Sequence, residues 1–304
     1  MRRRAADRSE HEDGLRSQAA QLRGLPGDPH GVLLVHGFSG SPFEVHMLAA
    51  VLHQRGYHVE VPLLPGHNQS LAALRESRWP DWLAAADAAL WALWRRVRGE
   101  GVAEPRLAVI GLSMGGLLTV ELARRYPAPA GGHLDEQAGA PDGASPAAER
   151  PVIRAIAVLS SPLWLPRWQE RAIRALCRVP GLRQLAVPKF AGSDVRALDL
   201  PRHRLRPPGM PLLAVRSLLE LMAEVRGHVP DVKQPALLAH GVLDHTAPFA
   251  CLAAFAKEIG SPPGTLHCLA LPRSYHLIPL DVEREILFAA LVEHLARYLG
   301  TPGA

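Results

Sequence analysis

One serine stands in a pattern that can turn its hydroxyl into a nucleophile. Residues 111–115 read G-L-S-M-G, a G-x-S-x-G pentapeptide centred on Ser113, and the pentapeptide alone is weak evidence. The residues on either side make the assignment more specific, because a short apolar run at 107–110 precedes the pentapeptide and apolar residues at helical spacing follow it. We therefore predict a sharp strand-to-helix turn that exposes the Ser113 hydroxyl at the positive end of a helix dipole. The alternative is a glycine-rich turn with an ordinary serine.

A serine hydroxyl needs a general base, and that base needs an acid to orient it. Asp244 lies on a turn after the strand-like run 236–239, and His276 lies on a loop after the strand-like run 265–271. Both residues therefore follow the ends of predicted strands, as Ser113 does. We predict that Ser113, Asp244 and His276 form a catalytic triad.

Other residues near these positions are less suited to the acid and base roles. The predicted strand 153–159 ends in S-S-P-L, which offers no carboxylate. Asp281 is interpreted as the cap of the last helix, predicted to start near that residue. His245 is expected to point away from Asp244, and Tyr275 is expected to pack beside His276.

An ester carbonyl under attack also needs donors for its developing oxyanion. The predicted strand 32–35 turns at His36-Gly37, and a helix is predicted from about Phe43. By position, the backbone N–H groups of Phe38 and Met114 would form the oxyanion hole. His36 is interpreted as a prop for this loop, and the alternative is that His36-Gly37 only makes a tight turn.

Strand and helix patterns alternate along most of the chain, which indicates an α/β fold. Such alternation predicts a mostly parallel sheet of about six or more strands, with helices on both faces and a small helical cap. Carboxyl ends of parallel strands meet at one sheet edge, where the candidates would converge. The predicted strands are 31–35, 57–62, 107–110, 153–159, 236–240 and 265–271.

The same patterns divide the chain into a core and its additions. A polar N-terminal extension without strand alternation is expected at residues 1–26. The core is predicted at 27–161 and 229–304, interrupted at 127–150 by a Pro-, Gly- and Ala-rich insertion that we expect to be flexible. The helical cap is predicted at 162–228.

The predicted cap is strongly basic, with twelve Lys or Arg against five Asp or Glu, a formal charge of +7. Helices are expected at 166–179 and 212–225, and arginines line one face of the first. One interpretation is a solvated basic face above an apolar face on the core. The more specific alternative is that the basic face of the cap contacts anionic membrane surfaces and delivers acyl substrates to the site.

Composition sets further bounds. A chain of 304 residues with 48% apolar residues can bury one large core. The three cysteines are expected to be buried, reduced thiols, and the charged N-terminus lacks the apolar region of a secretory signal, so a cytoplasmic location is expected. The scattered basic residues give no support for nucleic-acid binding. No metal-ligand spacing such as H-E-x-x-H occurs, so no metal is expected. The oligomeric state is not predicted.

Several motifs together resemble a known family. They are HGFSGSP, GYHVEVPLLPGH, GLSMGG and SYHLIPLD, together with the Asp244 segment. The chain resembles bacterial carboxylesterases and monoacylglycerol lipases of the α/β-hydrolase superfamily over residues 30–126 and 153–300. The chain departs from the family at Asn68, where glycine is frequent, and in the segment after Tyr126.

The resemblance implies an α/β-hydrolase fold and hydrolysis of carboxylic esters, including monoacylglycerols, without a cofactor. It places the family's catalytic residues on Ser113, Asp244 and His276, and its oxyanion amides on Phe38 and Met114. The expected partner is thus a small-molecule acyl ester. Alternatives are a thioesterase or acyltransferase on the same triad and, in another class, a non-catalytic hydrolase-fold binding module. Dehalogenase chemistry is disfavoured because a serine holds the place of that family's nucleophilic aspartate.

Overall fold

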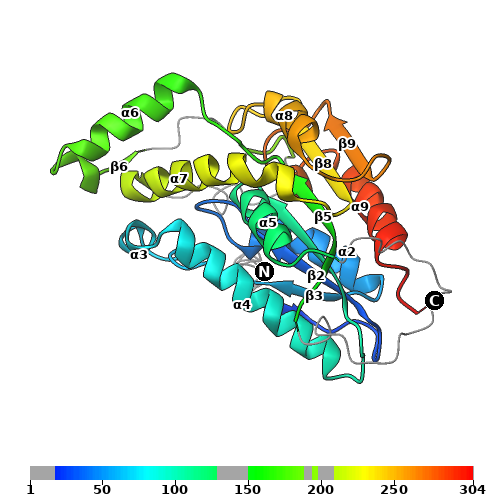
Figure 1. Ribbon diagram of the computed structural model, residues 1–304. Coiled ribbons are helices and arrows are strands. Elements are labelled where there is room, and N and C mark those ends of the chain that lie inside the picture. Colours follow the sequence, from blue (N-terminus) through cyan, green and yellow to red (C-terminus); the bar gives the residue numbers. More distant parts are fainter. Residues whose placement is uncertain (1–17, 129–149, 188–193, 198–208, 304) are drawn as a thin grey trace, which may run out of the picture.

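A seven-stranded sheet forms the centre of the computed structural model, which describes residues 18–128, 150–187, 194–197 and 209–303. The strand order is β1-β3-β2-β4-β5-β8-β9 (Figure 1). Six strands run parallel, and β1 pairs with β3 in the antiparallel direction. The strands are β1 (Ala20–Leu22), β2 (His30–Val35), β3 (His58–Val61), β4 (Arg106–Leu112), β5 (Ile153–Leu159), β8 (Ala236–Gly241) and β9 (Leu266–Leu271).

Helices cover both faces of this sheet. They are α2 (His46–Gln54), α3 (Leu71–Glu76), α4 (Trp79–Arg98), α5 (Met114–Arg125), α6 (Arg167–Arg178), α7 (Leu212–His228), α8 (Ala250–Glu258) and α9 (Arg284–Tyr298). Short 3-10 helices are η1 (Pro42–Val45), η3 (Leu182–Gln184), η5 (Val229–Asp231) and η6 (Ile278–Leu280). The α/β fold and all six predicted strands are confirmed, with ends that shift by one or two residues.

Two apolar cores hold the layers together, one on each side of the sheet. Side chains of α4, α5, α7 and α8 pack on one face, and those of α2, α9 and η6 pack on the other. Strand β2 serves both cores, because Leu33 and Val35 point into the first while Val32 and Leu34 point into the second. A strand buried on both faces reads as a continuous apolar run, which explains why the parallel strands are recognisable in the sequence.

The prediction that residues 1–26 lack a strand was wrong for β1. Ala20–Leu22 pairs with β3, and the Gln21 side chain donates a hydrogen bond to Glu60 Oε1 at 3.1 Å. Three residues are too short to show a period-two pattern, so the edge of β3 rather than local sequence determines this strand. Residues 1–17 of the predicted extension lie outside the described residues.

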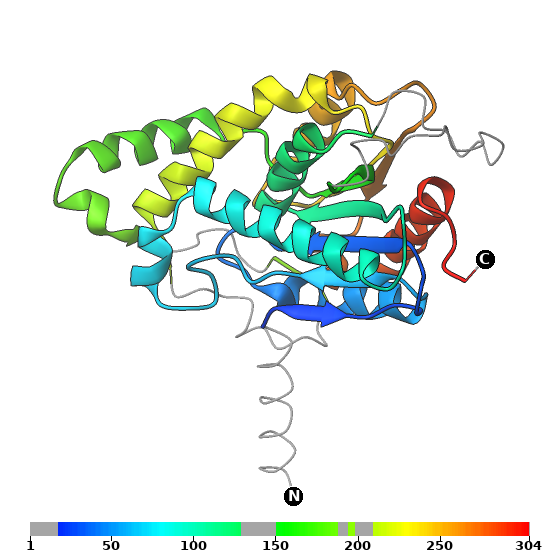
Figure 2. The same ribbon diagram turned by 60° about the horizontal axis from the view of Figure 1, so that its bottom comes forward.

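The cap contains both predicted helices, α6 and α7, which lie together above the core (Figures 1 and 2). Between them, β6 (Ala186–Val187) and β7 (Met210–Pro211) form a small antiparallel pair that the sequence patterns did not predict. Helix α7 packs against the core helix α5, whereas α6 packs on α7 at the outer edge. Most of the predicted flexible insertion, residues 129–149, lies outside the described residues.

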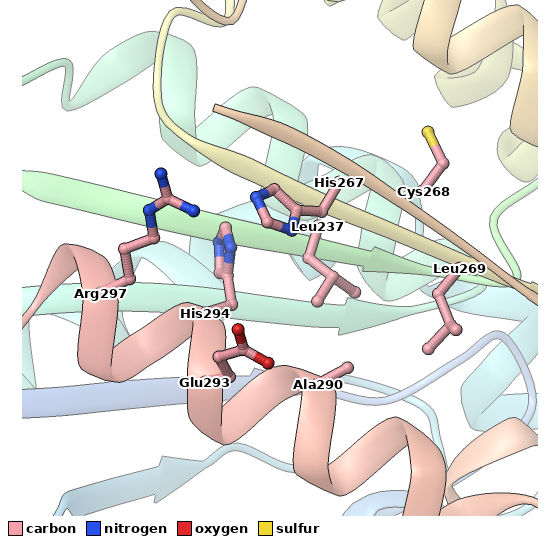
Figure 3. Close-up of a pocket in the computed structure, with 8 residues that line it drawn as sticks. All are labelled: Leu237, His267, Cys268, Leu269, Ala290, Glu293, His294 and Arg297. Carbon is pink, nitrogen blue, oxygen red and sulfur yellow. The ribbon is translucent and has the colours of Figure 1, made fainter. Parts of the chain in front are cut away.

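The cysteines depart from expectation at one position. Cys177 and Cys251 are buried free thiols, but Cys268 on β9 is exposed. The reason is that β9 is an edge strand, and Figure 3 shows Cys268 pointing away from α9 while Leu269 points toward it. A cavity of about 150 Å³ lies between β9 and α9, with His294 among its lining residues (Figure 3). Within the described residues, no helix has the length and apolar character required to span a lipid bilayer.

Candidate active site

Ser113 occupies the turn between β4 and α5 in a strained backbone conformation. Its φ is 55° and its ψ is −119°, a combination that non-glycine residues rarely adopt and that costs about 1–3 kcal/mol. Neighbouring β5 holds the turn, because Ser113 N–H donates to Leu159 O at 2.7 Å and Ser161 Oγ donates to Ser113 O at 2.6 Å. The surrounding structure therefore maintains a conformation that presents the Ser113 hydroxyl.

Two glycines of the pentapeptide allow this turn for steric reasons. A Cβ on Gly111 would lie 2.0 Å from Gly115 O, and a Cβ on Gly115 would lie 2.2 Å from Val35 O. Neither position can therefore hold a side chain without moving backbone. The G-x-S-x-G pattern thus reflects close packing of α5 against β2 and β4.

The structure brings Ser113, His276 and Asp244 into one hydrogen-bonded chain. His276 Nε2 lies 3.0 Å from Ser113 Oγ, and His276 Nδ1 lies 2.7 Å from Asp244 Oδ2. A carboxylate oxygen can only accept, so Nδ1 carries the proton and Nε2 offers a lone pair to the serine hydroxyl. The side chains are screened from water, with 0% of Asp244 and 4% of His276 exposed.

The carboxylate of Asp244 is held by four donors. Oδ1 accepts from the N–H groups of Thr246 (2.8 Å) and Ala247 (2.9 Å). Oδ2 accepts from His276 and also lies 3.1 Å from His240 Nε2. Burial by itself would raise the pKa of Asp244, but the charge of His276 and hydrogen bonds from His240, His276 and Ala247 hold that pKa well below its usual range. Asp244 is therefore ionised at every pH at which the protein would work.

Asp281 is not the helix cap that we predicted. Helix α9 begins at Arg284, and Asp281 is a fully buried tie for the loop that carries His276. Its Oδ1 accepts from the N–H groups of Arg196 (2.7 Å) and Ala197 (3.0 Å), and its Oδ2 accepts from Tyr275 N–H at 2.6 Å. The prediction was wrong because two of these donors, Arg196 and Ala197, lie 85 and 84 positions away in the sequence, where a local capping pattern cannot reveal them.

A short piece of the cap, residues 194–197, therefore contacts both candidate loops. Asp194 O accepts from Leu277 N–H at 3.0 Å, next to His276. Asp194 Oδ1 accepts from Thr246 Oγ1 at 2.9 Å, and Thr246 N–H in turn contacts Asp244. We call residues 194–197 the strap, because they fasten the acid loop and the histidine loop to each other.

The two predicted oxyanion donors lie on opposite sides of Ser113 in the sequence and come from different strands. Phe38 follows β2, and Met114 is the first residue of α5. Among the described residues, neither backbone N–H has a hydrogen-bond acceptor. The β2 loop approaches the serine closely, since a Cβ on Gly37 would lie 3.3 Å from Ser113 Cβ.

Buried polar groups fix this loop. Gly37 N–H donates to Glu44 Oε2 at 2.8 Å. His36 donates from Nδ1 to Gly37 O at 2.9 Å and accepts at Nε2 from Leu64 N–H at 3.2 Å. Burial, with a smaller contribution from His67, lowers the pKa of His36 to about 3, so the imidazole stays neutral. These contacts agree with the interpretation of His36 as a prop.

An aromatic cluster lies beneath the same loop. The His67 ring contacts the rings of Phe38 and Trp82 at centroid distances of 6.0 Å and 5.5 Å. Burial lowers the pKa of His67 to about 4, which keeps this ring neutral as well. The next residue, Asn68, has a φ of 51°. Asparagine tolerates the left-handed region better than most non-glycine residues, so Asn68 can adopt this backbone conformation without a glycine.

Comparison with known proteins identifies the family of this chain. Residues 28–283 match the Hydrolase_4 family, described as serine aminopeptidase, S33. The chain belongs to this family. It is a serine hydrolase with an α/β-hydrolase fold.

Relatives of this serine hydrolase are lipases and esterases. It is 27% identical to a thermostable monoacylglycerol lipase from Bacillus sp. (strain H-257), over 90% of this chain and 92% of the relative. It is 22% identical to a carboxylesterase from Bacillus subtilis (strain 168), over 89% of this chain and 94% of that protein. A solved structure from work on LipS and LipT, two metagenome-derived lipolytic enzymes, has a TM-score of 0.74 and 26% identity, covering 93% of this chain and 98% of that one.

Other candidates in this hydrolase lie outside the hydrogen-bonded chain. His245 is exposed and its ring packs on Tyr275 at a centroid distance of 5.0 Å. No group of three or more His, Cys, Asp or Glu within the described ranges could hold a metal ion. Sequence reasoning missed His240, Ser161 and Glu44, which contact the site. The one local signal was the spacing of four between His240 and Asp244 across the break at the end of β8.

Proposed function

We propose that this serine hydrolase cleaves acyl esters, monoacylglycerols among them, through a Ser113–His276–Asp244 acyl-enzyme mechanism. His276 Nε2 takes the Ser113 proton as Oγ bonds to the ester carbonyl carbon, and the N–H groups of Phe38 and Met114 stabilise the oxyanion. The ester C–O bond then breaks, and the imidazolium protonates the departing alkoxide oxygen to give the alcohol. Water, deprotonated by the same histidine, attacks the acyl-enzyme; the acyl–Oγ bond breaks, the imidazolium returns its proton to Ser113 Oγ, and the carboxylic acid is released.

One observation carries this proposal: a strained serine whose Oγ lies 3.0 Å from an imidazole that is itself held at 2.7 Å by a buried carboxylate. A non-catalytic binding module would need neither this hydrogen-bonded arrangement of three side chains nor the strained backbone at Ser113. Because the charge of His276 and the hydrogen bonds to the carboxylate keep Asp244 ionised despite its burial, the carboxylate can stabilise the imidazolium that forms during proton transfer.

The choice of acyl substrates is supported by partly buried apolar side chains of the β2 loop, the start of α4 and the cap. They pack against the core cluster that contains α5 and α7, and they include Phe38, Trp79, Trp164, Leu165 and Ile173. Each methylene moved from water to such surroundings contributes about 0.8 kcal/mol. The names of the two Bacillus relatives, a monoacylglycerol lipase and a carboxylesterase, point to the same substrate class.

A fluorophosphonate probe combined with a substrate panel tests the proposal. We expect covalent labelling at Ser113 and kcat/KM values for p-nitrophenyl esters that rise at least about 10-fold from acetate to octanoate, given the gain per methylene. Monoacylglycerols should be hydrolysed, whereas amino-acyl p-nitroanilides, the substrates of an aminopeptidase, should not. An absence of labelling would favour the binding-module alternative. Faster turnover of acyl-CoA than of oxygen esters would favour the thioesterase.

The outer surface of the cap supports a proposed contact with anionic membranes. Helix α6 exposes Arg167, Arg171, Arg174 and Arg178, and Trp168 beside them has 70% of its surface exposed. Further apolar side chains are exposed just beyond this helix, namely Val179, Leu182 and Leu185. Arginines next to exposed tryptophan and leucine side chains are suited to an interface of anionic headgroups and acyl chains. Figures 1 and 2 show α6 at the outer edge of the molecule.

We expect the protein to bind vesicles that contain phosphatidylglycerol and to release them as salt increases. Each basic residue near an anionic surface contributes about 1 kcal/mol, so R171Q/R174Q should weaken binding about 30-fold at low salt. The control is R55Q/K257Q, which removes one exposed charge just after α2 and one on α8. Co-sedimentation measures both variants. Binding that is insensitive to salt, or equally weakened by the control pair, would contradict membrane contact through α6.

A further inference from the structure

We propose that His240 is a positioning residue that donates a second N–H to Asp244, the acid of the proposed triad. Through this contact it sets how strongly the carboxylate interacts with His276. This inference rests on the proposed function, because it assigns a role within the same hydrogen-bonded chain. His240 lies on β8, four residues before Asp244, and touches neither Ser113 nor the reacting ester in the proposed mechanism. It would act on catalysis only through Asp244.

The contact geometry places two imidazoles on one carboxylate oxygen. His276 Nδ1 lies 2.7 Å from Asp244 Oδ2, and His240 Nε2 lies 3.1 Å from the same atom. The His240 side chain is 2% exposed, so water does not compete for this contact. A carboxylate and a carbonyl both only accept, and His240 Nε2 also lies 3.2 Å from Ala247 O. Nε2 must therefore carry a proton that is shared between Asp244 Oδ2 and Ala247 O.

The packing around His240 fixes the ring in this direction. Its imidazole stands edge-to-face on Phe249, at a centroid distance of 5.8 Å and an interplanar angle of 84°. Gly241, the next residue, packs against the histidine loop, because a Cβ there would lie 2.1 Å from Tyr275 O. His240 is thus held by the same tight strand end that brings the acid loop against the histidine loop.

The second donor has a definite chemical consequence. An N–H that is shared between Asp244 Oδ2 and Ala247 O draws part of the carboxylate charge away from His276. Removing it would leave more charge facing His276, which stabilises the imidazolium and makes the neutral base harder to obtain. The acid limb, which is the low-pH part of the curve of kcat/KM against pH where activity rises, should then move to higher pH. His240 also limits rotation of the carboxylate, so its loss should lower the maximal rate.

Other ionisable groups near this carboxylate are few among the described residues. His276 faces it from the histidine loop, and Cys251 of α8 interacts with it electrostatically. Asp194 of the strap reaches it through Thr246. The substitutions below leave all three in place, so a shift of the acid limb reports on His240.

The test compares two variants of similar shape. H240M removes the donor, whereas H240Q keeps an N–H near the Nε2 position. In H240M we expect the acid limb to rise by about one pH unit and kcat/KM on the acid side to fall about 10-fold, as expected for loss of a hydrogen bond to a charged group. In H240Q the limb should stay within about 0.3 units of wild type, because a side-chain N–H is again available.

A buried histidine away from the site serves as control. His294 on α9 lies 3.1 Å from Ile156 O through Nε2 and lines the cavity beside β9 (Figure 3). H294M should lower the melting temperature without moving the acid limb. If H240M and H240Q shifted the limb equally, or if H240M lost only stability as H294M does, the role of His240 would be purely structural and the inference would be overturned.

A measurement on the wild-type protein covers the case in which H240M does not fold. Nitrogen-15 NMR of histidine-labelled protein should show His240 protonated at Nε2 throughout the active pH range. An Nε2 without a proton would overturn the inference. Failure of the proposed function is distinguishable, because it would appear as an unlabelled Ser113 in the fluorophosphonate experiment whatever the state of His240.

Discussion

Replacement of Ser113 by alanine is expected to lower kcat for every ester substrate by a factor on the order of 10⁶, the effect seen when a triad nucleophile is removed. The substitution removes only the hydroxyl group, whose Oγ lies 3.0 Å from His276 Nε2. Alanine retains the backbone contacts to Leu159 and Ser161, so the fold should persist. Steady-state kinetics with p-nitrophenyl butyrate, together with circular dichroism, measures both results.

A glycine at the same position supplies the matched comparison. S113G should be as inactive as S113A but more stable by about 1 kcal/mol, because a φ of 55° and a ψ of −119° suit glycine far better than serine or alanine. Denaturant unfolding of the two variants measures the difference. Substantial turnover in either variant would show that Ser113 is not the nucleophile, and equal stability would show that its backbone strain is small.

The second large effect is expected for Asp244→Asn, with a loss of roughly 10⁴-fold in kcat. The N–H groups of Thr246 and Ala247 both point at Oδ1, so the amide oxygen of asparagine must take that position. The amide NH₂ then faces His276, and the imidazole turns to the tautomer whose Nε2 carries the proton. Such an imidazole cannot accept the Ser113 proton. Kinetics over a range of pH should show a low rate that no pH restores.

A second aspartate–histidine pair in the same chain provides the control. Asp28 Oδ1 lies 2.7 Å from His30 Nδ1, and both residues are buried. They lie at the amino end of β2, at the edge of the sheet opposite the triad, and His30 Nε2 contacts Leu299 O rather than a serine. D28N should therefore cost about 1–3 kcal/mol of stability and leave kcat unchanged. A comparable loss of kcat in D28N would mean that D244N acts through the fold rather than through the tautomer.

Part of the candidate site could be predicted from the sequence. Buried parallel strands are recognisable as apolar runs, and residues that follow the ends of such strands lie at one edge of the sheet. The proximity of Ser113, Asp244 and His276 was therefore predictable. Their catalytic roles stay predictions that the variants above test. The short strand β1 was missed because pairing with β3, rather than a local pattern, creates it.

The remaining errors concern contacts that local sequence patterns do not reveal. Asp281 has the local appearance of a helix cap, yet its Oδ1 accepts hydrogen bonds from the N–H groups of Arg196 and Ala197 in the strap. His240 reads as an ordinary strand residue, because only the turn after β8 brings Asp244 back beside it. Cys268 was expected to be buried, but the strand order leaves β9 at an edge. For Asp281 and Cys268 the deciding fact is which distant segments become neighbours, and spacing along the chain does not contain it. For His240 the spacing of four is local, but only the turn after β8 turns it into a contact.

The strap has a practical meaning for protein engineering. Asp194 and Arg196 belong by position to the cap, but they brace the loops of Asp244 and His276. A chimaera that exchanged all of residues 162–228 for the cap of another hydrolase of this family would therefore remove a brace from the proposed triad along with the cap. Transplants designed to alter chain-length preference should keep residues 194–197 from the recipient and splice the foreign helices on either side of them.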